Sequence, residues 1–260
     1  MKEQIIGLIA AMPEEISPLL KLVGAYNRSA VAGFNLYRFS LCGKSCLLME
    51  AGIGLERAGR AAEALIASAR PDCMISFGFG GAVQPGMAVG DLAVARSSRL
   101  YQGDNCEGGE TILLKVSANI MRRVEAISVK QGCAARQGDF LTTAEILSKR
   151  ELVKNLLPDL VSPVLDMETW AVARTAHRED IPFLAIRAIS DASDEELGFS
   201  ISEFTDSKMN IRIPKILRTI ALKPHIIPQL IRLARNSRIA GRNLAALVKE
   251  LLQNDIASEP

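Results

Sequence analysis

Short apolar runs recur along the chain, and each ends at glycines or at an acidic residue. The runs at 5–11, 72–77 and 182–190 are almost continuously apolar, which is typical of strands buried on both faces. Stretches with helical spacing lie between them, at 56–69, 117–129 and 169–178. Because such strands need helices on both sides, this alternation favours an α/β fold over all-α and all-β folds.

The remaining segments fill in the order of elements. Further strand-like runs lie at 36–41, 45–50, 91–95 and 164–166, the stretch 134–141 is mixed, and 144–157 is helix-like. Pro13 stands where a helix can begin, with Glu14 and Glu15 in its first turn. We therefore expect a three-layer αβα domain with a mixed central sheet.

The ends of the expected strands carry residues suited to a ligand site. In open α/β sheets, ligands bind beyond the carboxyl ends of the strands. There the chain has carboxylates at Glu14 or Glu15, at Glu168 and at Asp191. The glycines at the same ends would let a ligand approach the backbone closely, and they are Gly52, Gly54, Gly78, Gly80 and Gly81.

Converging carboxylates suit chemistry on a sugar that is linked to a heterocycle. One can accept the protons of two ribose hydroxyls, a second can activate water, and a third, when protonated, can donate to a leaving ring nitrogen. Cleavage of an N-glycosidic bond passes through an oxocarbenium-like transition state, which nearby carboxylates stabilise. Each carboxylate alone also has a structural interpretation, as a first-turn or N-cap residue of a helix. Their convergence on one sheet edge favours the functional interpretation.

Five motifs, in order, resemble the nucleoside phosphorylase/nucleosidase superfamily, and within it the methylthioadenosine/S-adenosylhomocysteine nucleosidase branch. They are Ile6-Gly7-Leu8-Ile9-Ala10-Ala11-Met12-Pro13-Glu14-Glu15, Ala51-Gly52-Ile53-Gly54, Phe77-Gly78-Phe79-Gly80-Gly81 with Pro85, Gly90 and Asp91, Asp166-Met167-Glu168, and Ile186-Arg187-Ala188-Ile189-Ser190-Asp191. The resemblance implies a nucleoside phosphorylase-like fold, and a homodimer that releases adenine from a 5′-substituted adenosine without a cofactor.

The resemblance also implies a role for individual residues. Glu15 would activate the attacking water, and Asp191 would donate a proton to the purine N7 as the base leaves. Met167 and Glu168 would hold the ribose, and Phe140 would stack on the purine. It further places five residues at substrate-binding positions, namely Met12, Gly78, Phe79, Leu141 and Ser190.

The choice between hydrolysis and phosphorolysis depends on cations near the first strand. Phosphate-using relatives carry an arginine after that strand and another beside the glycine-rich core, because a bound dianion needs cations or helix N-termini. Here the first loop carries Glu14 and Glu15, and no arginine flanks 76–78, so we expect hydrolysis. Arg187 lies close by in sequence, and phosphorolysis therefore stays the alternative.

Some positions depart from the family pattern and leave the 5′ substituent open. Phe79 stands where a small polar residue is usual, Asp166 replaces a glutamate, and Thr169-Trp170 is bulkier than usual. The segment 166–168 and the Pro- and Arg-rich ending also resemble the hopanoid-associated branch, which removes adenine from adenosylhopane. A lipid-linked nucleoside would account for the apolar Phe79 and Trp170 if they line the site.

The C-terminal part of the chain differs in charge from the rest. Ten of the 31 lysines and arginines lie between Lys208 and Lys249, in a stretch without any acid. Apolar residues recur at helical spacing from Leu230 to Leu251. We expect residues 1–207 to form the catalytic domain and 208–260 to form a basic helical extension. The extension either packs on that domain or contacts an anionic membrane surface.

Composition bears on the other function classes. A catalytically silent nucleoside-binding protein on the same fold is an alternative, although the presence of Glu15, Glu168 and Asp191 argues against it. Nucleic acid is not an expected partner, because the basic tail has no aromatic residue to stack on bases. Five scattered cysteines and two histidines favour no metal site. With no signal peptide and no long apolar span, we expect a cytoplasmic protein, with peripheral contact to the inner face of the membrane left open.

Overall fold

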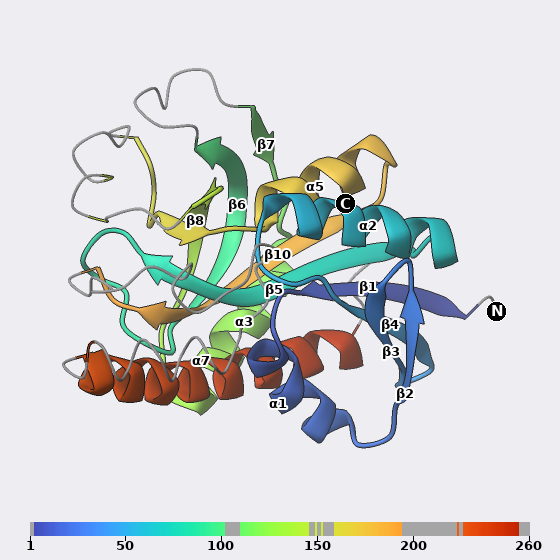
Figure 1. Cartoon of the computed structure of the whole chain (residues 1–260), viewed down its shortest axis with the longest axis horizontal. Helices are drawn as coiled ribbons and strands as arrows, with labels where there is room; N and C mark the ends of the chain where they lie inside the picture. The colour runs from blue at the N-terminus through green and yellow to red at the C-terminus, as the bar shows by residue number, and fades with distance from the viewer. Residues whose placement is uncertain are drawn as a thin grey trace.

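The structure, a computed structural model, describes residues 3–101, 110–145, 149, 152, 159–193, 223 and 226–254. Within these residues the strands form one mixed sheet with helices on both faces (Figure 1). The strands are β1 (Gln4–Ala10), β2 (Asn27–Val31), β3 (Phe34–Leu41), β4 (Lys44–Glu50), β5 (Cys73–Ala82), β6 (Leu92–Tyr101), β7 (Thr111–Leu113), β8 (Ala135–Thr143), β9 (Val164–Asp166) and β10 (Phe183–Asp191). The helices are α1 (Pro13–Val23), α2 (Leu55–Ala69), α3 (Ala118–Gln131), α5 (Thr169–Arg178) and α7 (Ile227–Gln253).

Strand β5 is the central strand of the sheet and pairs with three others. It pairs in parallel with β1 and β10, and antiparallel with β9. From β10 the pairing continues through β6 and β8 to β9, so that these four strands and β5 close a ring. On the other side, β1 pairs in parallel with β4, which leads to β3 and β2. The parallel strands β1, β4, β5 and β10 therefore end at the same edge of the sheet.

Two layers of helices cover the sheet, which confirms the expected αβα architecture. Helices α1, α3 and α7 lie on one face, and α2 and α5 lie on the other (Figure 1). Neighbouring residues of β1 show why its run is continuously apolar. Leu8 belongs to the core on the side of α1 and α7, whereas Ile9 belongs to the core under α2 and α5.

Helix α7 carries much of the basic tail and packs against α1, α3, β5 and β10. Its buried positions include Leu244, Leu247 and Val248, which belong to the same apolar core as β1 and α1. The arginines at 235, 238 and 242 are exposed on its outer side. This part of the tail is thus packed into the α/β core. The expected domain boundary at 207/208 stays a prediction, because residues 194–222 are not among those described.

Local differences from the sequence-based expectations have physical reasons. Strand β2 was not expected, because its exposed residues at the sheet edge lack an apolar pattern. The glycine cluster 78–81 lies inside β5 and not after it, and a Cβ on Gly78, Gly80 or Gly81 would lie within 2.7 Å of a neighbouring side chain. The mixed stretch 134–141 is strand β8. Most of the expected helix 144–157 lies outside the described residues.

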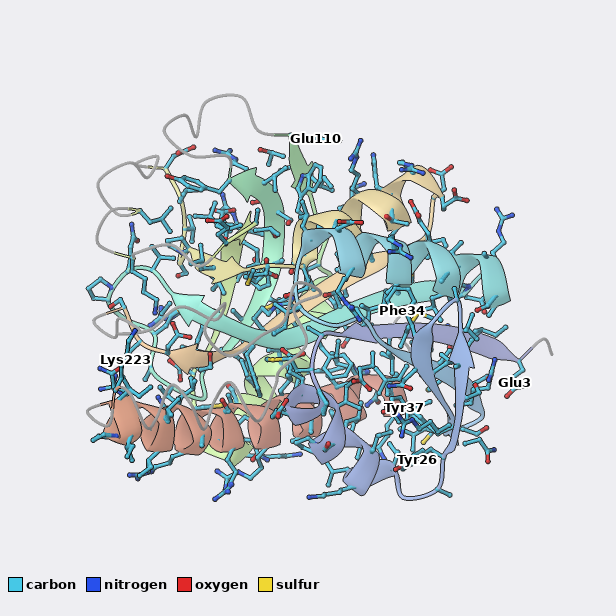
Figure 2. All side chains as sticks on the ribbon, in the orientation of Figure 1. Glu3, Tyr26, Phe34, Tyr37, Glu110 and Lys223 are labelled. Carbon is cyan, nitrogen blue, oxygen red and sulfur yellow. The ribbon has the colours of Figure 1, made fainter. Side chains whose placement is uncertain are left out.

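Two further features concern the helices and the surface of the protein. Within the described residues, no helix has the length and apolar character needed to cross a membrane. Beside α1, the rings of Tyr26 and Tyr37 meet edge to face with centroids 5.7 Å apart (Figure 2). Tyr26 is partly exposed there, whereas Tyr37 is buried against the core formed with α1.

Candidate active site

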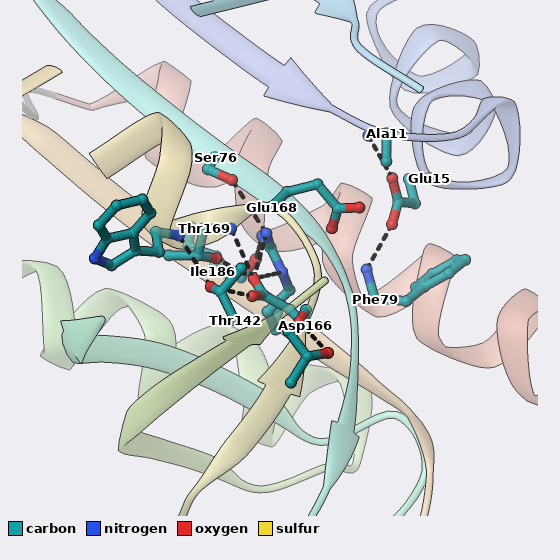
Figure 3. A network of polar contacts seen from close by, with 12 residues as sticks. Ala11, Glu15, Ser76, Phe79, Thr142, Asp166, Glu168, Thr169 and Ile186 are labelled. Carbon is teal, nitrogen blue, oxygen red and sulfur yellow. Dashed lines mark hydrogen bonds and ion pairs between the residues drawn. The ribbon is translucent and has the colours of Figure 1, made fainter. Parts of the chain in front are cut away.

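Glu15 lies at the start of α1 and is almost fully buried. Its Oε2 accepts the N–H groups of Ala11 (2.8 Å) and Met12 (2.9 Å), and its Oε1 accepts the N–H of Phe79 (2.7 Å) (Figure 3). A carboxylate has about four acceptor sites, so these three bonds leave one for a ligand or a water molecule. Glu14, the other residue considered from the sequence, is exposed.

The backbone of β5 approaches this carboxylate closely. A Cβ atom on Gly78 would lie 2.6 Å from Oε1 of Glu15, which is too close for any side chain. The glycine therefore allows the hydrogen bond between Glu15 and the next residue, Phe79. Burial raises the pKa of Glu15 above its usual range, against the effect of its hydrogen bonds and of Arg187. A buried carboxylate of this kind is a stronger base than an exposed one.

Glu168 faces the same region from the other side. It precedes α5, and its Oε1 accepts the N–H of Gly54 (2.9 Å) at the start of α2. Burial raises the pKa of Glu168 to about 8, and the charges of Asp166 and Glu15 add to the effect. Gly54 has a φ of 105°, a conformation that favours glycine, and in this conformation its N–H meets Glu168.

Arg187 lies under these two glutamates and is 2% exposed. Its Nη2 lies 2.7 Å from Oδ2 of Asp166, and its Nε donates to the same oxygen (3.0 Å). Asp166 also accepts from Thr142 Oγ1 (2.6 Å) and from both the N–H (3.1 Å) and the hydroxyl of Thr169 (Figure 3). The aspartate that replaces the usual glutamate is thus the ion-pair partner of the buried arginine.

A small recess separates the two glutamates. It lies at the carboxyl end of β1 and beside the middle of β5. Its lining comprises Ile9, Ala10, Ala11, Glu15, Ser76, Phe77, Gly78, Glu168 and Arg187. The two carboxyl groups and the buried arginine thus face one small space.

The raised pKa of Glu168 predicts a pH-dependent stability. Between pH 4.5 and about 8 the folded protein keeps a proton on Glu168 that the unfolded chain has released, so stability falls as the pH rises through this window. We expect the Tm of the wild type to fall between pH 5 and pH 8. Glu168→Gln, which is neutral throughout, should reduce this fall, by an amount equivalent to several kcal/mol.

Thermal unfolding followed by circular dichroism at several pH values would test this prediction. Glu179→Gln is a matched control, because Glu179 is exposed at the C-terminal end of the same helix. Parallel curves of Tm against pH for the wild type and Glu168→Gln would contradict the prediction, since they would mean that Glu168 is already charged at neutral pH.

Asp191 ends β10 at the same edge of the sheet. Ser190 Oγ donates to its Oδ1 (2.7 Å), and Lys149 forms an ion pair with its Oδ2. The backbone of Gly81 lies close by, since a Cβ there would be 2.7 Å from Oδ2 of Asp191. The Ser190 hydroxyl thus holds one oxygen of the Asp191 carboxyl group. Lys149 was missed, because 42 residues separate it from Asp191 and no motif surrounds it.

Of the other expected site residues, Gly78 lines the recess, and the rest lie beside it or in the core. Met12 and Phe79 donate backbone N–H groups to Glu15, and the Phe79 ring points away from Glu168 toward α7 (Figure 3). Met167, directly before Glu168, is partly buried. Phe140 and Leu141 are both fully buried in β8, and Phe140 packs in an apolar cluster with Ala82 and Ile189. Phe140 therefore exposes no ring face on which a purine could stack.

Among the described residues, no three His, Cys, Asp or Glu side chains gather as metal ligands would. The functional groups that the sequence did not single out are cationic. Arg187 was noted only because it lies close to the site in sequence. Its pairing with Asp166 depends on contact between β10 and β9 residues that are 21 positions apart.

Comparisons with known proteins identify relatives of this chain. The model of the phosphorylase superfamily matches residues 5–221. The 5′-methylthioadenosine/S-adenosylhomocysteine nucleosidase of a Listeria monocytogenes serotype 4b strain is 30% identical over 219 residues, which cover 76% of this chain and 91% of that protein. The nucleosidase of the same name from Listeria innocua is 29% identical over 83% of this chain and 99% of its own length.

Solved structures show the same fold. A 5′-methylthioadenosine/S-adenosylhomocysteine nucleosidase from Neisseria meningitidis, in complex with methylthio-immucillin-A, superposes with a TM-score of 0.70 at 20% identity. The match covers 96% of this chain and 99% of that one. The futalosine hydrolase of Helicobacter pylori superposes with a TM-score of 0.68 at 18% identity, over 95% of this chain and 98% of the other.

Proposed function

Because this chain belongs to the phosphorylase superfamily, we propose that it is a nucleosidase, a hydrolase that splits the N-glycosidic bond of a 5′-substituted adenosine and releases adenine. Its relatives with 27–30% identity are named for methylthioadenosine and S-adenosylhomocysteine. The substrate is therefore a purine nucleoside of this type. The site residues do not specify which organic group the 5′ carbon carries.

The observation that carries the choice of hydrolysis is that the positive charge in the lining of the recess is already engaged. Glu15 and Glu168 face it with two carboxyl groups, and the cation among its lining residues, Arg187, is already paired with Asp166. A phosphate dianion needs donors and positive charge that are not engaged elsewhere. Water needs only a base, and Glu15 has one acceptor site left for it.

Each group has a role in the proposed reaction. Glu15 takes a proton from the water that attacks C1′, and Glu168 binds the ribose hydroxyls from the opposite side of the recess. Met167, next to Glu168, packs against the sugar. Asp191, with Ser190 bonded to it, gives a proton to the purine N7 as the bond between C1′ and N9 breaks. The carboxyl groups also stabilise the positive charge that develops on the ribose ring.

The proposal is tested by measuring free adenine from purified protein. We expect adenine to be released from methylthioadenosine, S-adenosylhomocysteine or both, and much more slowly from inosine, whose base is not adenine. Chromatography of the reaction mixture separates the base from the nucleoside. Nucleoside binding without any release of base would instead indicate a silent binding protein on the same fold.

The subfamily and cellular setting belong to the same proposal. We propose a cytoplasmic homodimer, and we include adenosylhopane as a candidate substrate because 166–168 and the basic ending resemble the hopanoid-associated branch. The outer side of α7 supports peripheral contact with an anionic membrane, since exposed Ile227 and Ile231 lie near exposed arginines on one helix. Co-sedimentation of the protein with phosphatidylserine vesicles at low salt, and its loss at high salt, would support this contact. Light scattering tests the dimer.

A further inference from the structure

A buried lysine holds the proposed proton donor. Lys149 is 6% exposed, and its Nζ forms an ion pair with Oδ2 of Asp191. The same nitrogen donates to the backbone carbonyl oxygens of Asp191 (3.2 Å) and Ala192 (2.7 Å). An ammonium group has three N–H donors, so the whole hydrogen-bonding capacity of Lys149 is directed at Asp191 and the next residue.

The contacts of Asp191 show what this arrangement does. Ser190 Oγ donates to Oδ1, whereas Lys149 holds Oδ2, so both oxygens of the carboxyl group have a fixed partner. The register between β10 and β5 shifts between Ile189 and Asp191, and Gly81 of β5 leaves room for both Asp191 and Lys149. At this irregular strand end, the lysine fixes the backbone as well as the side chain.

Stability alone is a weak reason for such a pair. Removing an ammonium and a carboxylate from water costs several kcal/mol each, and buried ion pairs are often no more stable than apolar residues in their place. Asp191 keeps 23% of its side chain exposed, while the side chain of Lys149 keeps 7%. The carboxyl group is thus accessible to a ligand, and the lysine lies behind it.

We propose that Lys149 is a positioning residue for leaving-group activation, an inference that rests on the proposed function. In the reaction, Oδ1 of Asp191 carries the proton that passes to N7 while Oδ2 stays bonded to Lys149. The electron pair of the breaking C1′–N9 bond moves into the purine, and Asp191 returns to the carboxylate of the ion pair. The ammonium of Lys149 stabilises that carboxylate as it forms and keeps it aimed at the base. A stabilising charge that acts most strongly in the transition state raises the rate.

A pair of substrates separates this role from a structural one. Lys149→Met keeps the length and apolar stem of the side chain and removes the charge. We expect kcat/KM for the adenine nucleoside to fall about 10²-fold. Hydrolysis of 4-nitrophenyl β-ribofuranoside with the same 5′ substituent should stay within about threefold of the wild type, because 4-nitrophenolate leaves without a proton. Lys130→Met, at an exposed lysine of α3, is the matched control.

A double variant shows whether Lys149 acts through Asp191. Lys149→Met should lower the rate little further once Asp191→Asn is present, because the two groups serve one step. An equal loss on both substrates, or losses that multiply in the double variant, would overturn the inference and leave the lysine with a structural role. A wild type that hydrolyses the 4-nitrophenyl riboside but no adenine nucleoside would overturn the proposed function itself, and this inference with it.

Discussion

Replacing Glu15 with glutamine is expected to lower kcat by about two to four orders of magnitude, which is the usual contribution of a general base. The amide cannot take a proton from water. It also meets a backbone that offers only donors, because Ala11 and Met12 donate to one oxygen and Phe79 donates to the other. The amide NH₂ must therefore oppose an N–H group, and the Tm should fall as well.

The neighbouring Glu14 provides the control for this variant. It lies in the same first turn of α1 but is exposed, so Glu14→Gln should keep both the activity and the Tm. Adenine release and thermal unfolding, measured on the same preparations, separate lost chemistry from lost structure. A folded Glu15→Gln protein, shown by an increase of its Tm with bound adenine, that kept more than a tenth of wild-type kcat would contradict the assignment of the base.

Replacing Asp191 with asparagine is the second large expected effect. Asparagine can still accept a hydrogen bond from Ser190, but it has no proton to pass to N7 and does not pair with the ammonium of Lys149. We expect kcat/KM for the adenine nucleoside to fall by about two to four orders of magnitude. Steady-state kinetics of adenine release measure the loss.

Asp180→Asn is the matched control, because Asp180 is exposed and precedes β10, at the opposite end of that strand from Asp191. Its backbone has a φ of 53°, a conformation that asparagine also adopts readily, so this substitution should leave folding and activity unchanged. Activity of Asp191→Asn within tenfold of the wild type would mean that another group protonates the base, or that the base leaves without a proton.

The sequence predicted the elements that carry strong local signals. Helix α5 and strand β10 lie within one residue of the expected bounds, because each has a clear period or a continuous apolar run. Glu15 was identified by its motif at the start of a helix. Strand β2 was not, since Asn27–Val31 is an exposed edge strand held by its pairing with β3 and not by apolar burial.

Contacts between residues far apart in the chain could not be predicted from the sequence. The ion pair of Arg187 with Asp166, and that of Lys149 with Asp191, depend on side chains that meet only after the sheet has formed. The burial of Phe140 has the same origin, since strand β8 is enclosed between β6 and β9. A motif places such a residue at a strand end, but the packing of its neighbours decides which way it points.

The most direct test of the proposed mechanism is to identify the group that attacks C1′. The reaction is run with and without inorganic phosphate, and the sugar product is identified by ³¹P NMR and by a reducing-sugar assay. We predict one equivalent of free reducing sugar for each adenine, at a rate that phosphate does not change. A strict need for phosphate and a sugar 1-phosphate product would contradict water activation by Glu15, and with it the assignment of the recess between Glu15 and Glu168 to hydrolysis.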